Sequence, residues 1–180
     1  MVMENDHPPG PSLEPREPSV EDLVILCREL NRLGARYVVV GGFAMRAAGF
    51  VRQTMDVDLI VAPDLENEAL IYQALEVLPD KAVKELQPGE LAKYTVIRVA
   101  DEVVVDLMKA AGGIHYAEAA TQTIIHELSG IPVPFASPQL LWRMKAVSHR
   151  EKDLLDLSFL RRLFEARGEN PPAVGSATSG

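Results

Sequence analysis

Two aspartates separated by one residue, with a third on a later strand, have the clearest chemical potential in the sequence. Asp56 and Asp58 lie in the run Asp-Val-Asp-Leu-Ile-Val. Because side chains alternate along a strand, both carboxylates are expected on one face, where they repel each other and lose hydration if covered. Mg²⁺ relieves this conflict, since it is a hard cation usually held by one or two carboxylates together with substrate phosphates. An exposed strand face or a turn is the alternative for such a pair.

Asp106 strengthens the metal interpretation, because it interrupts the apolar run Val103–Met108. A carboxylate in a strand needs a partner, or else an edge position open to water. On a neighbouring strand it would complete a two-metal cluster of Mg²⁺, or alternatively Mn²⁺, in which one ion activates the attacking oxygen and the other the leaving group. An edge-strand aspartate in solvent is the competing interpretation.

Gly41-Gly42 follows an apolar run and precedes Phe43–Ala48, which is expected to form a short helix. A glycine pair lets backbone N–H groups and a helix N-terminus approach phosphates, although a tight strand-to-helix turn uses the same residues. The pattern is neither GxGxxG nor GxxxxGK[ST], so neither a Rossmann nor a P-loop site is supported. Arg52 and Thr54 come just before the acids. An arginine there can hold a triphosphate by paired hydrogen bonds, or can simply lie in a surface loop.

Composition limits the class of protein. The chain has 180 residues, 47% of them hydrophobic, which fits one ordinary globular domain. The lone Cys27 excludes an internal disulfide and a CxxC metal site, and it favours a reducing compartment. The longest apolar stretch, Tyr37–Met45, has nine residues, against roughly 18 for a membrane span. The N-terminus has no signal-peptide pattern, so we expect a cytoplasmic protein with no membrane association.

The net charge of −8 argues against a nonspecific coat on DNA or RNA, because such proteins need a cationic surface. The proline-rich residues 1–18 are expected to form a disordered leader and residues 168–180 a disordered tail, which leaves 19–167 as a single domain. Within that domain, residues 140–167 hold seven Lys and Arg against four acids. A substrate that carries phosphate is therefore expected to meet the last helices.

Local signals predict an α+β fold. Ser19 with Asp22 resembles a capping box that begins a helix, and Gly34 is placed to end it. Strands are expected at Tyr37–Val40 and Asp56–Ala62. The remaining expected elements are a helix from Asp64 to about Leu78 with Leu65, Ala69, Tyr72 and Leu75 on one face, hairpins of Tyr94–Val99 with Val103–Met108 and of Ile124–Leu128 with Ile131–Phe135, and helices at Pro138–Val147 and Glu151–Ala166.

Together these residues resemble the nucleotidyltransferase-fold superfamily, the group related to DNA polymerase beta. The segments that carry the resemblance are Val38-Val39-Val40-Gly41-Gly42, Arg52-x-Thr54-x-Asp56-Val57-Asp58-Leu59 and Asp106. The AbiEii-type branch of toxin–antitoxin and abortive-infection proteins is still more similar. It also carries a lysine helix followed by Lys-Asp-x-x-Asp-Leu, which Lys145 and the segment from Lys152 to Leu157 match. Gly42 stands where many relatives have serine, and the chain is shorter than many toxins of the branch.

The resemblance implies a small mixed β-sheet flanked by helices, with the C-terminal helices packed alongside. It implies an enzyme that moves an NMP from an NTP to a hydroxyl acceptor, which is a tRNA 3′ end, a protein side chain or a small molecule such as an aminoglycoside. The implied metal ligands and catalytic groups are Asp56, Asp58 and Asp106, and the implied nucleotide-binding residues are Gly41, Gly42, Arg52, Thr54 and Lys145.

Alternatives stay open at this point. Lys145 shares a helix face with Leu141, which also fits a lysine whose stem lies at the edge of the core. Lys152, Asp153 and Asp156 also fit solvated charges at helical spacing. The whole chain also fits a catalytically silent nucleotide-binding or interaction module. A third possibility is that the protein is a component of a toxin–antitoxin system, which acts through protein contacts and has an antitoxin as its partner.

Overall fold

Helix α1 (Val20–Leu33) begins and ends where the sequence predicts. The Ser19 hydroxyl accepts the Asp22 N–H at 3.3 Å, and the Asp22 carboxylate accepts the Ser19 N–H at 2.7 Å, which completes the capping box. Gly34 ends the helix with a φ of +71°. The computed structural model describes residues 14–174. Within them, no helix is both long enough and apolar enough to cross a bilayer.

Six strands form one mixed sheet. Their bounds are β1 (Tyr37–Val40), β2 (Asp56–Val61), β3 (Val96–Ala100), β4 (Val104–Met108), β7 (Thr123–Leu128) and β8 (Ile131–Ala136). The spatial order is β3-β4-β2-β1-β8-β7. The β3–β4 and β7–β8 pairs are antiparallel, which confirms both predicted hairpins. β1 runs antiparallel to β2 and parallel to β8, and β2 runs parallel to β4.

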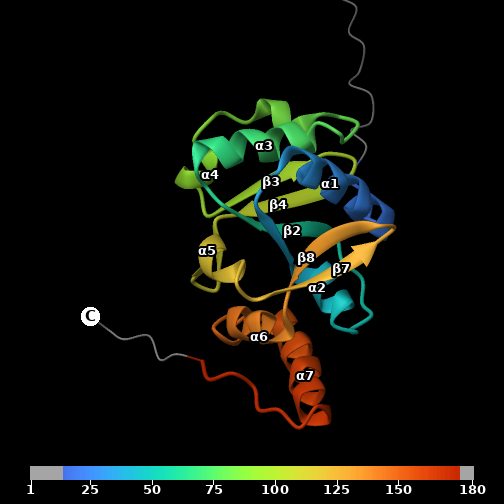
Figure 1. Ribbon diagram of the computed structural model, residues 1–180, viewed down its shortest axis with the longest axis vertical. Coiled ribbons are helices and arrows are strands. Elements are labelled where there is room, and N and C mark those ends of the chain that lie inside the picture. Colours follow the sequence, from blue (N-terminus) through green and yellow to red (C-terminus); the bar gives the residue numbers. More distant parts are fainter. Residues whose placement is uncertain (1–13, 175–180) are drawn as a thin grey trace, which may run out of the picture.

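Helices lie around this sheet. The longer ones after α1 are α2 (Gly41–Ala47), α3 (Leu65–Leu75), α6 (Pro138–Ala146) and α7 (Glu151–Ala166). The sequence did not predict several short elements, namely a 3-10 helix (Ala82–Glu85), α4 (Glu90–Lys93), α5 (Tyr116–Ala119) and the pair β5 (Ala110–Ala111) and β6 (Ile114–His115). In Figure 1, α1 and α3 lie side by side at one end of the molecule, and α6 and α7 lie at the opposite end.

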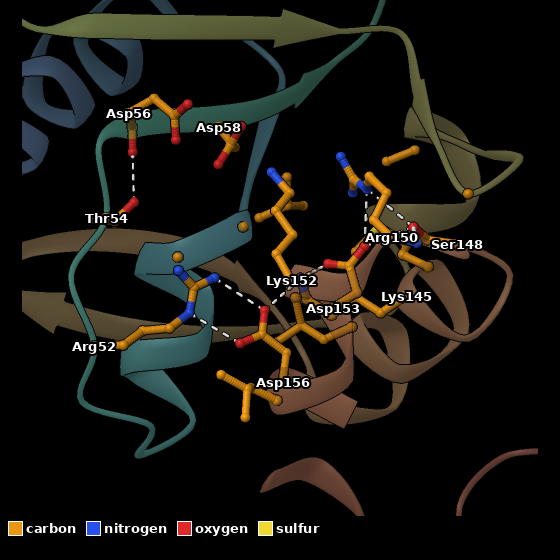
Figure 2. Close-up of a pocket in the computed structure, with 18 of the residues that line it drawn as sticks. Arg52, Thr54, Asp56, Asp58, Lys145, Ser148, Arg150, Lys152, Asp153 and Asp156 are labelled. Carbon is orange, nitrogen blue, oxygen red and sulfur yellow. Dashed lines mark hydrogen bonds and ion pairs between the residues drawn. The ribbon is translucent and has the colours of Figure 1, made fainter. Parts of the chain in front are cut away.

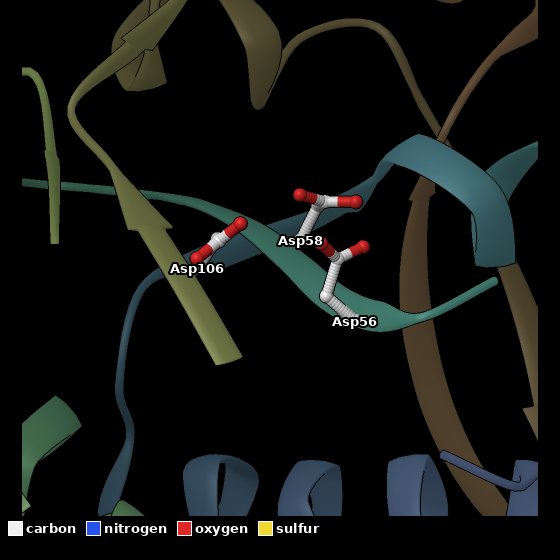
Figure 3. Close-up of side chains that lie close together, drawn as sticks. All are labelled: Asp56, Asp58 and Asp106. Atoms are coloured by element: carbon white, nitrogen blue, oxygen red, sulfur yellow. The ribbon is translucent and has the colours of Figure 1, made fainter. Parts of the chain in front are cut away.

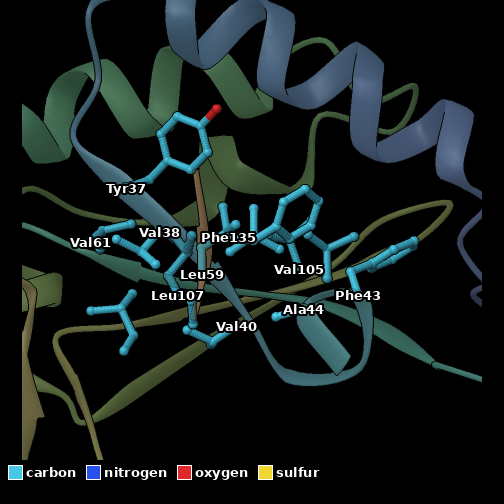
Figure 4. Close-up of a cluster of buried hydrophobic side chains, with 14 of the residues drawn as sticks. Tyr37, Val38, Val40, Phe43, Ala44, Leu59, Val61, Val105, Leu107 and Phe135 are labelled. Atoms are coloured by element: carbon cyan, nitrogen blue, oxygen red, sulfur yellow. The ribbon is translucent and has the colours of Figure 1, made fainter. Parts of the chain in front are cut away.

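The core combines side chains of the central strands with side chains of the helices that cover the sheet. Figure 4 shows Leu59 of β2 with Val105 and Leu107 of β4 in the same buried cluster. All three are at most 1% exposed. Because successive side chains of a strand point to opposite faces, this packing leaves Asp56 and Asp58 on the other face of the sheet.

The predicted apolar face of α3 is only partly buried: Leu75 is 0% exposed and Tyr72 packs against the core, but Ala69 is exposed. Leu65 is 65% exposed, whereas Asn67 and Glu68 are buried. The physical reason is that both polar side chains bind backbone groups of neighbouring loops. The Asn67 amide donates to the carbonyls of Arg36 and Ala62 at 3.0 and 2.8 Å, and the Glu68 carboxylate accepts the N–H groups of residues 89 and 91. These buried positions are polar because they form hydrogen bonds with backbone groups of other segments, so the buried face of the helix does not show the regular spacing of apolar residues.

The predicted leader and tail lie partly outside the described residues, at 1–13 and 175–180. The described parts contact the domain. Arg16 pairs with Asp22 at 2.7 Å and with Glu102 at 3.0 Å. At the other end, the Trp142 indole N–H donates to the Pro172 carbonyl at 3.1 Å.

Candidate active site

The three aspartates singled out in the sequence meet on one face of the sheet. Asp58 pairs in register with Asp106 on the neighbouring parallel strand β4, and Asp56 lies two residues earlier on β2. One carboxylate oxygen of each residue lies within 4.8 Å of the other two. Figure 3 shows the three carboxylates gathered on the same side of the two strands. Since β4 lies between β2 and β3, Asp106 is not on an edge strand. We call these residues the acid cluster.

The acid cluster carries more negative charge than its surroundings stabilise. Burial raises the pKa of Asp58 to about 7, and the nearby charges of Asp56 and Asp106 contribute in the same direction, against a smaller opposing effect of Lys152. A carboxylate in this situation is stabilised by an added cation. Three oxygen donors at such spacing fit a hard divalent ion such as Mg²⁺ or Mn²⁺.

Arg98 on β3 is a member of the site that the sequence analysis missed. Its Nε donates to Asp106 Oδ1 at 2.9 Å and its Nη2 to Asp106 Oδ2 at 2.8 Å, and Nη2 also lies 3.3 Å from Asp56 Oδ2. These ion pairs raise the pKa of Arg98 above its ordinary value. The observed register places Arg98 directly across from Asp106, where opposite charges commonly pair. The predicted hairpin, with its turn at residues 100–102, places Arg98 opposite Val104 instead.

The turn from β1 into α2 passes directly beneath the acid cluster. Gly41 has a φ of +63°, and a Cβ atom there would overlap the Asp58 carboxylate. A Cβ atom on Gly42 would overlap the Thr54 side chain, so a serine does not fit this position. Thr54 is buried, and its hydroxyl donates to the Asp56 carbonyl at 3.0 Å. The glycine pair therefore belongs to the first turn of α2, which starts at Gly41 and not at Phe43 as predicted.

A cavity of about 680 Å³ opens in front of these residues. One side, which we call the strand wall, consists of Gly41, Gly42, Asp56 and Asp58 with the loop that leads into β2. The opposite side, the helix wall, comes from α6, α7 and their connection, and its lining residues are Leu141, Met144, Lys145, Val147, Ser148, Arg150, Lys152, Asp153, Leu155 and Asp156. Figure 2 shows Asp56 and Asp58 on their strand, across the cavity from Lys145, Asp153 and Asp156.

An ion network holds the helix wall together. Lys145 Nζ lies 3.0 Å from Asp153 Oδ1 and 2.7 Å from Asp156 Oδ2. Arg52, from the opposite side of the cavity, also pairs with Asp156 at 3.0 Å (Figure 2). Arg150 Nε lies 3.0 Å from Asp153 Oδ2. We call these five residues the helix-wall network.

The alternative that Asp153 and Asp156 are solvated charges is wrong, since their side chains are each 2% exposed. Cationic side chains surround both carboxylates inside the protein. Burial by itself raises the pKa of Asp153, but the hydrogen bond from the Ser148 hydroxyl and the charges of Lys145 and Arg150 outweigh it, and the net pKa is lowered. Lys152, by contrast, is exposed.

The structure places all of the predicted nucleotide-binding residues at the cavity, although not all in the expected manner. Gly41, Gly42, Arg52, Thr54 and Lys145 line it. The charges of Arg52 and Lys145 are both compensated by Asp156. The ammonium group of Lys145 therefore faces carboxylates and not bulk water, which differs from a lysine at the edge of the core. The role of each residue toward a nucleotide stays a prediction.

The fold is similar to solved structures, although sequence comparison finds no match. No protein-family model and no curated protein sequence matches the chain. The lincomycin-bound crystal structure of the lincosamide antibiotic adenylyltransferase LnuA aligns at a TM-score of 0.52 and 13% sequence identity, covering 82% of this chain and 99% of that chain. The chain has a nucleotidyltransferase fold. This similarity confirms the predicted class, an α+β fold with a mixed sheet flanked by helices.

Two further solved structures align with lower TM-scores. An antigenic nucleotidyltransferase-like protein from Paracoccidioides brasiliensis is 18% identical, with a TM-score of 0.47 over 83% of this chain and 78% of that chain. The solution structure of the antibiotic-resistance factor ANT(2'')-Ia is 16% identical, with a TM-score of 0.45 over 81% of this chain and 90% of that chain. The assignment to the AbiEii-type branch stays a prediction.

Proposed function

We propose that the protein is a Mg²⁺-dependent nucleotidyltransferase that moves an NMP from an NTP to a hydroxyl acceptor, with Mn²⁺ as the alternative ion. The observation that supports it most directly is the acid cluster, in which three carboxylates lie within 4.8 Å of one another at a cavity. Burial and the neighbouring carboxylates raise the pKa of Asp58 to about 7, and a divalent cation held by the cluster would relieve their repulsion. The nucleotidyltransferase fold supports the same reaction class.

Each part of the cavity has a role in this reaction. Asp56, Asp58 and Asp106 would hold the ions, which when bound neutralise phosphate charge and activate the acceptor oxygen. The Gly41-Gly42 turn lets the backbone come close to the phosphates, because neither residue has a side chain in the way. Arg52, from the loop that leads into β2, and Lys145, from the helix wall, both line the cavity and would offset the remaining phosphate charge.

Asp106 would also accept the proton of the acceptor hydroxyl. In the structure, both of its carboxylate oxygens already accept hydrogen bonds from Arg98. Each carboxylate oxygen has a second lone pair, so Asp106 can accept the proton while Arg98 stays bound or after Arg98 gives up a bond.

Among the acceptors that the sequence left open, a small molecule has the most support. Several apolar side chains line the cavity beside its charged groups, including Met55, Met108, Met144, Val147 and Leu155. Flexible methionines adapt to varied apolar surfaces, which suits an acceptor or a nucleobase with an apolar face. In the helix wall, Lys145 and Arg150 are paired with carboxylates and do not form an open basic track for a polynucleotide. LnuA, which shares the fold, is by name an adenylyltransferase of lincosamide antibiotics.

A catalytically silent nucleotide-binding module is the second candidate, and Arg98 is the observation that favours it. Its ion pairs with Asp106 and Asp56 supply part of the positive charge that a metal would bring. A toxin function with an antitoxin partner, and transfer to tRNA or protein, stay predictions that the same experiment covers.

The test is to incubate the protein with Mg²⁺ and labelled NTPs, in separate arms with hydroxylated antibiotics, total tRNA and cell protein. We expect label transfer in the antibiotic arm and its loss in the double variant Asp56→Asn with Asp58→Asn. Asp80→Asn is the matched control, because Asp80 is an exposed aspartate outside the cavity. Transfer that survives in the double variant contradicts the metal assignment. Binding of Mg²⁺–NTP by calorimetry without transfer in any arm favours the silent module.

A further inference from the structure

The guanidinium group of Arg98 is hydrogen-bonded to Asp106, one of the three proposed metal ligands of the acid cluster. It meets Asp106 as a two-pronged fork, with donor–acceptor distances of 2.9 and 2.8 Å, and its Nη2 lies 3.3 Å from Asp56. A fork of this kind is the strongest form of arginine–carboxylate pairing. Asp56 and Asp58 line the cavity, but Asp106 is not among its lining residues. The third acid is thus engaged by protein before any ligand arrives.

We propose that Arg98 is an internal counter-cation that competes with the divalent ion for Asp106 and Asp56. The three-acid site is then complete only after the ion displaces this guanidinium. The inference rests on the proposed function in one respect, the assignment of the acid cluster as the metal site, and it adds a control on when that site forms.

The two partners differ in their freedom to move, and this difference decides which one gives way. The side chain of Arg98 is 62% exposed, whereas that of Asp106 is 9% exposed. β3 is the edge strand of the sheet, so Arg98 can turn toward solvent without leaving a hole in the core. Asp106 is on an internal strand whose register with Asp58 is fixed by strand pairing. The acids therefore stay in place while the guanidinium leaves.

Charge gives the direction of the effect. A divalent ion that enters the cluster meets the positive charge of Arg98 at close range, and it must also replace the bonds that the fork supplies. Both effects lower metal affinity in the wild-type protein. The same bonds stabilise the metal-free protein, because they partly offset the repulsion among the three carboxylates. Removing the fork should thus raise affinity for the ion and weaken the metal-free fold.

The experiment is a calorimetric titration of the full chain with Mn²⁺, and separately with Mg²⁺, after removal of bound metal with EDTA. We expect Arg98→Gln to bind Mn²⁺ roughly tenfold more tightly than the wild type, as removal of a close positive charge and a forked pair implies. Arg98→Lys retains the charge but not the fork, and its affinity should lie between the two. Arg36→Gln is the matched control, because Arg36 is an exposed arginine that pairs with Asp64 at 2.6 Å outside the cavity.

Thermal unfolding supplies a second readout that does not depend on activity. In EDTA, Arg98→Gln should unfold at a lower temperature than the wild type, and saturating Mn²⁺ should remove or reverse the gap. Equal Mn²⁺ affinity of wild type and Arg98→Gln overturns the inference and leaves the metal assignment intact. Tighter binding by Arg98→Gln together with wild-type affinity in Arg98→Lys also overturns it, because simple charge repulsion then explains the result. If neither the wild type nor any variant binds Mn²⁺, the metal assignment itself fails.

Discussion

Two groups of buried carboxylates face each other across the cavity, and they differ in the cations that accompany them. In the helix-wall network, three cationic side chains surround two carboxylates. In the acid cluster, the described structure pairs only the guanidinium of Arg98 with the carboxylates, and it reaches Asp56 and Asp106 but not Asp58. The helix-wall network is therefore saturated with positive charge, whereas the acid cluster is deficient in it.

The pKa directions follow from this difference. The pKa of Asp58 is raised to about 7 by burial and by its acidic neighbours. The pKa of Asp153 is lowered, because its hydrogen bond to Ser148 and the nearby cations outweigh burial. One residue type thus serves two purposes, and the local charge balance distinguishes a structural aspartate from one that is ready to take a ligand.

The largest expected effect comes from breaking the saturated network. Asp156→Ala leaves Lys145 and Arg52 without a shared carboxylate inside the protein. We expect the free energy of unfolding, measured by urea denaturation, to fall by about 3–5 kcal/mol. Glu29→Ala, which removes an exposed i,i+3 partner of Arg32, is the control and should change stability little. A loss no larger than that of the control would show that the network is not structural.

A smaller loss is expected where the glycine turn meets the acid cluster. Gly41→Ala combines an unfavourable backbone conformation with a collision against Asp58, and should lower the free energy of unfolding by about 2–4 kcal/mol. Gly34→Ala is the matched control, since Gly34 has a similar φ of +71° but no atom near the added methyl group. Its cost should be about 1 kcal/mol. Equal losses would mean that the close approach to Asp58 has no energetic weight.

Asp58→Asn should have the opposite sign to Asp156→Ala in metal-free protein. It removes one charge from a cluster that has too many, and we expect stabilisation on the order of 1–2 kcal/mol at pH 8 in EDTA. The same variant should lose Mn²⁺ binding in a calorimetric titration. A loss of stability would show that the charge of Asp58 is already well compensated.

The smallest expected effect is the dependence of stability on pH, which tests the difference between Asp58 in the acid cluster and Asp153 in the helix-wall network. The folded-state pKa of Asp58 is raised from its ordinary value, 3.8, to about 7, so the folded protein holds a proton that the unfolded chain releases. Stability from this group is therefore lost as pH rises between those values, by at most about 1.4 kcal/mol per pH unit. Asp153, whose pKa is lowered, acts in the opposite sense below its ordinary value.

The measurement is urea denaturation in EDTA across pH 3 to 9 for wild type and Asp58→Asn. The difference between the two curves isolates Asp58, and it should grow with pH until about pH 7 and then level off. A constant difference across this range would contradict the raised pKa.

Local chemistry made much of the fold predictable from the sequence. The capping box at Ser19, the Asp64 cap of α3 and the Ser137-Pro138 start of α6 are all signals that a few neighbouring residues contain. The buried face of α3 was not predictable in this way. Asn67 is buried because the backbone of a segment 31 residues away needs its amide, and no spacing rule in the helix records that need.

In the candidate site too, features set by neighbouring residues could be predicted and features set by distant contacts could not. The two acids on β2 and the glycine pair can be read from the sequence because strand alternation and turn chemistry are local. The burial of Asp156 was missed, since Asp156 pairs with Arg52, which is 104 positions away. Asp153 pairs instead with Lys145 and Arg150 from its own stretch of chain, and its burial depends on how α6 and α7 pack.

The fork from Arg98 was missed for a different reason. The predicted turn, at residues 100–102, lies one residue earlier than the observed one, and this shift puts Val104 and not Asp106 opposite Arg98.

The two walls of the cavity come from separate stretches of chain, joined by the ion pair between Arg52 and Asp156. Residues 40–58 position Asp56 and Asp58 with the loop before them, and residues 141–156 close the cavity from α6 and α7. Apolar lining positions such as Met144, Val147 and Leu155 take no part in the ion network. Their size and shape can therefore drift through evolution, or be altered in the laboratory, without disturbing the carboxylates opposite. In the proposed enzyme, substitutions at these apolar positions would change which acceptor fits the cavity while the metal-binding carboxylates stay the same.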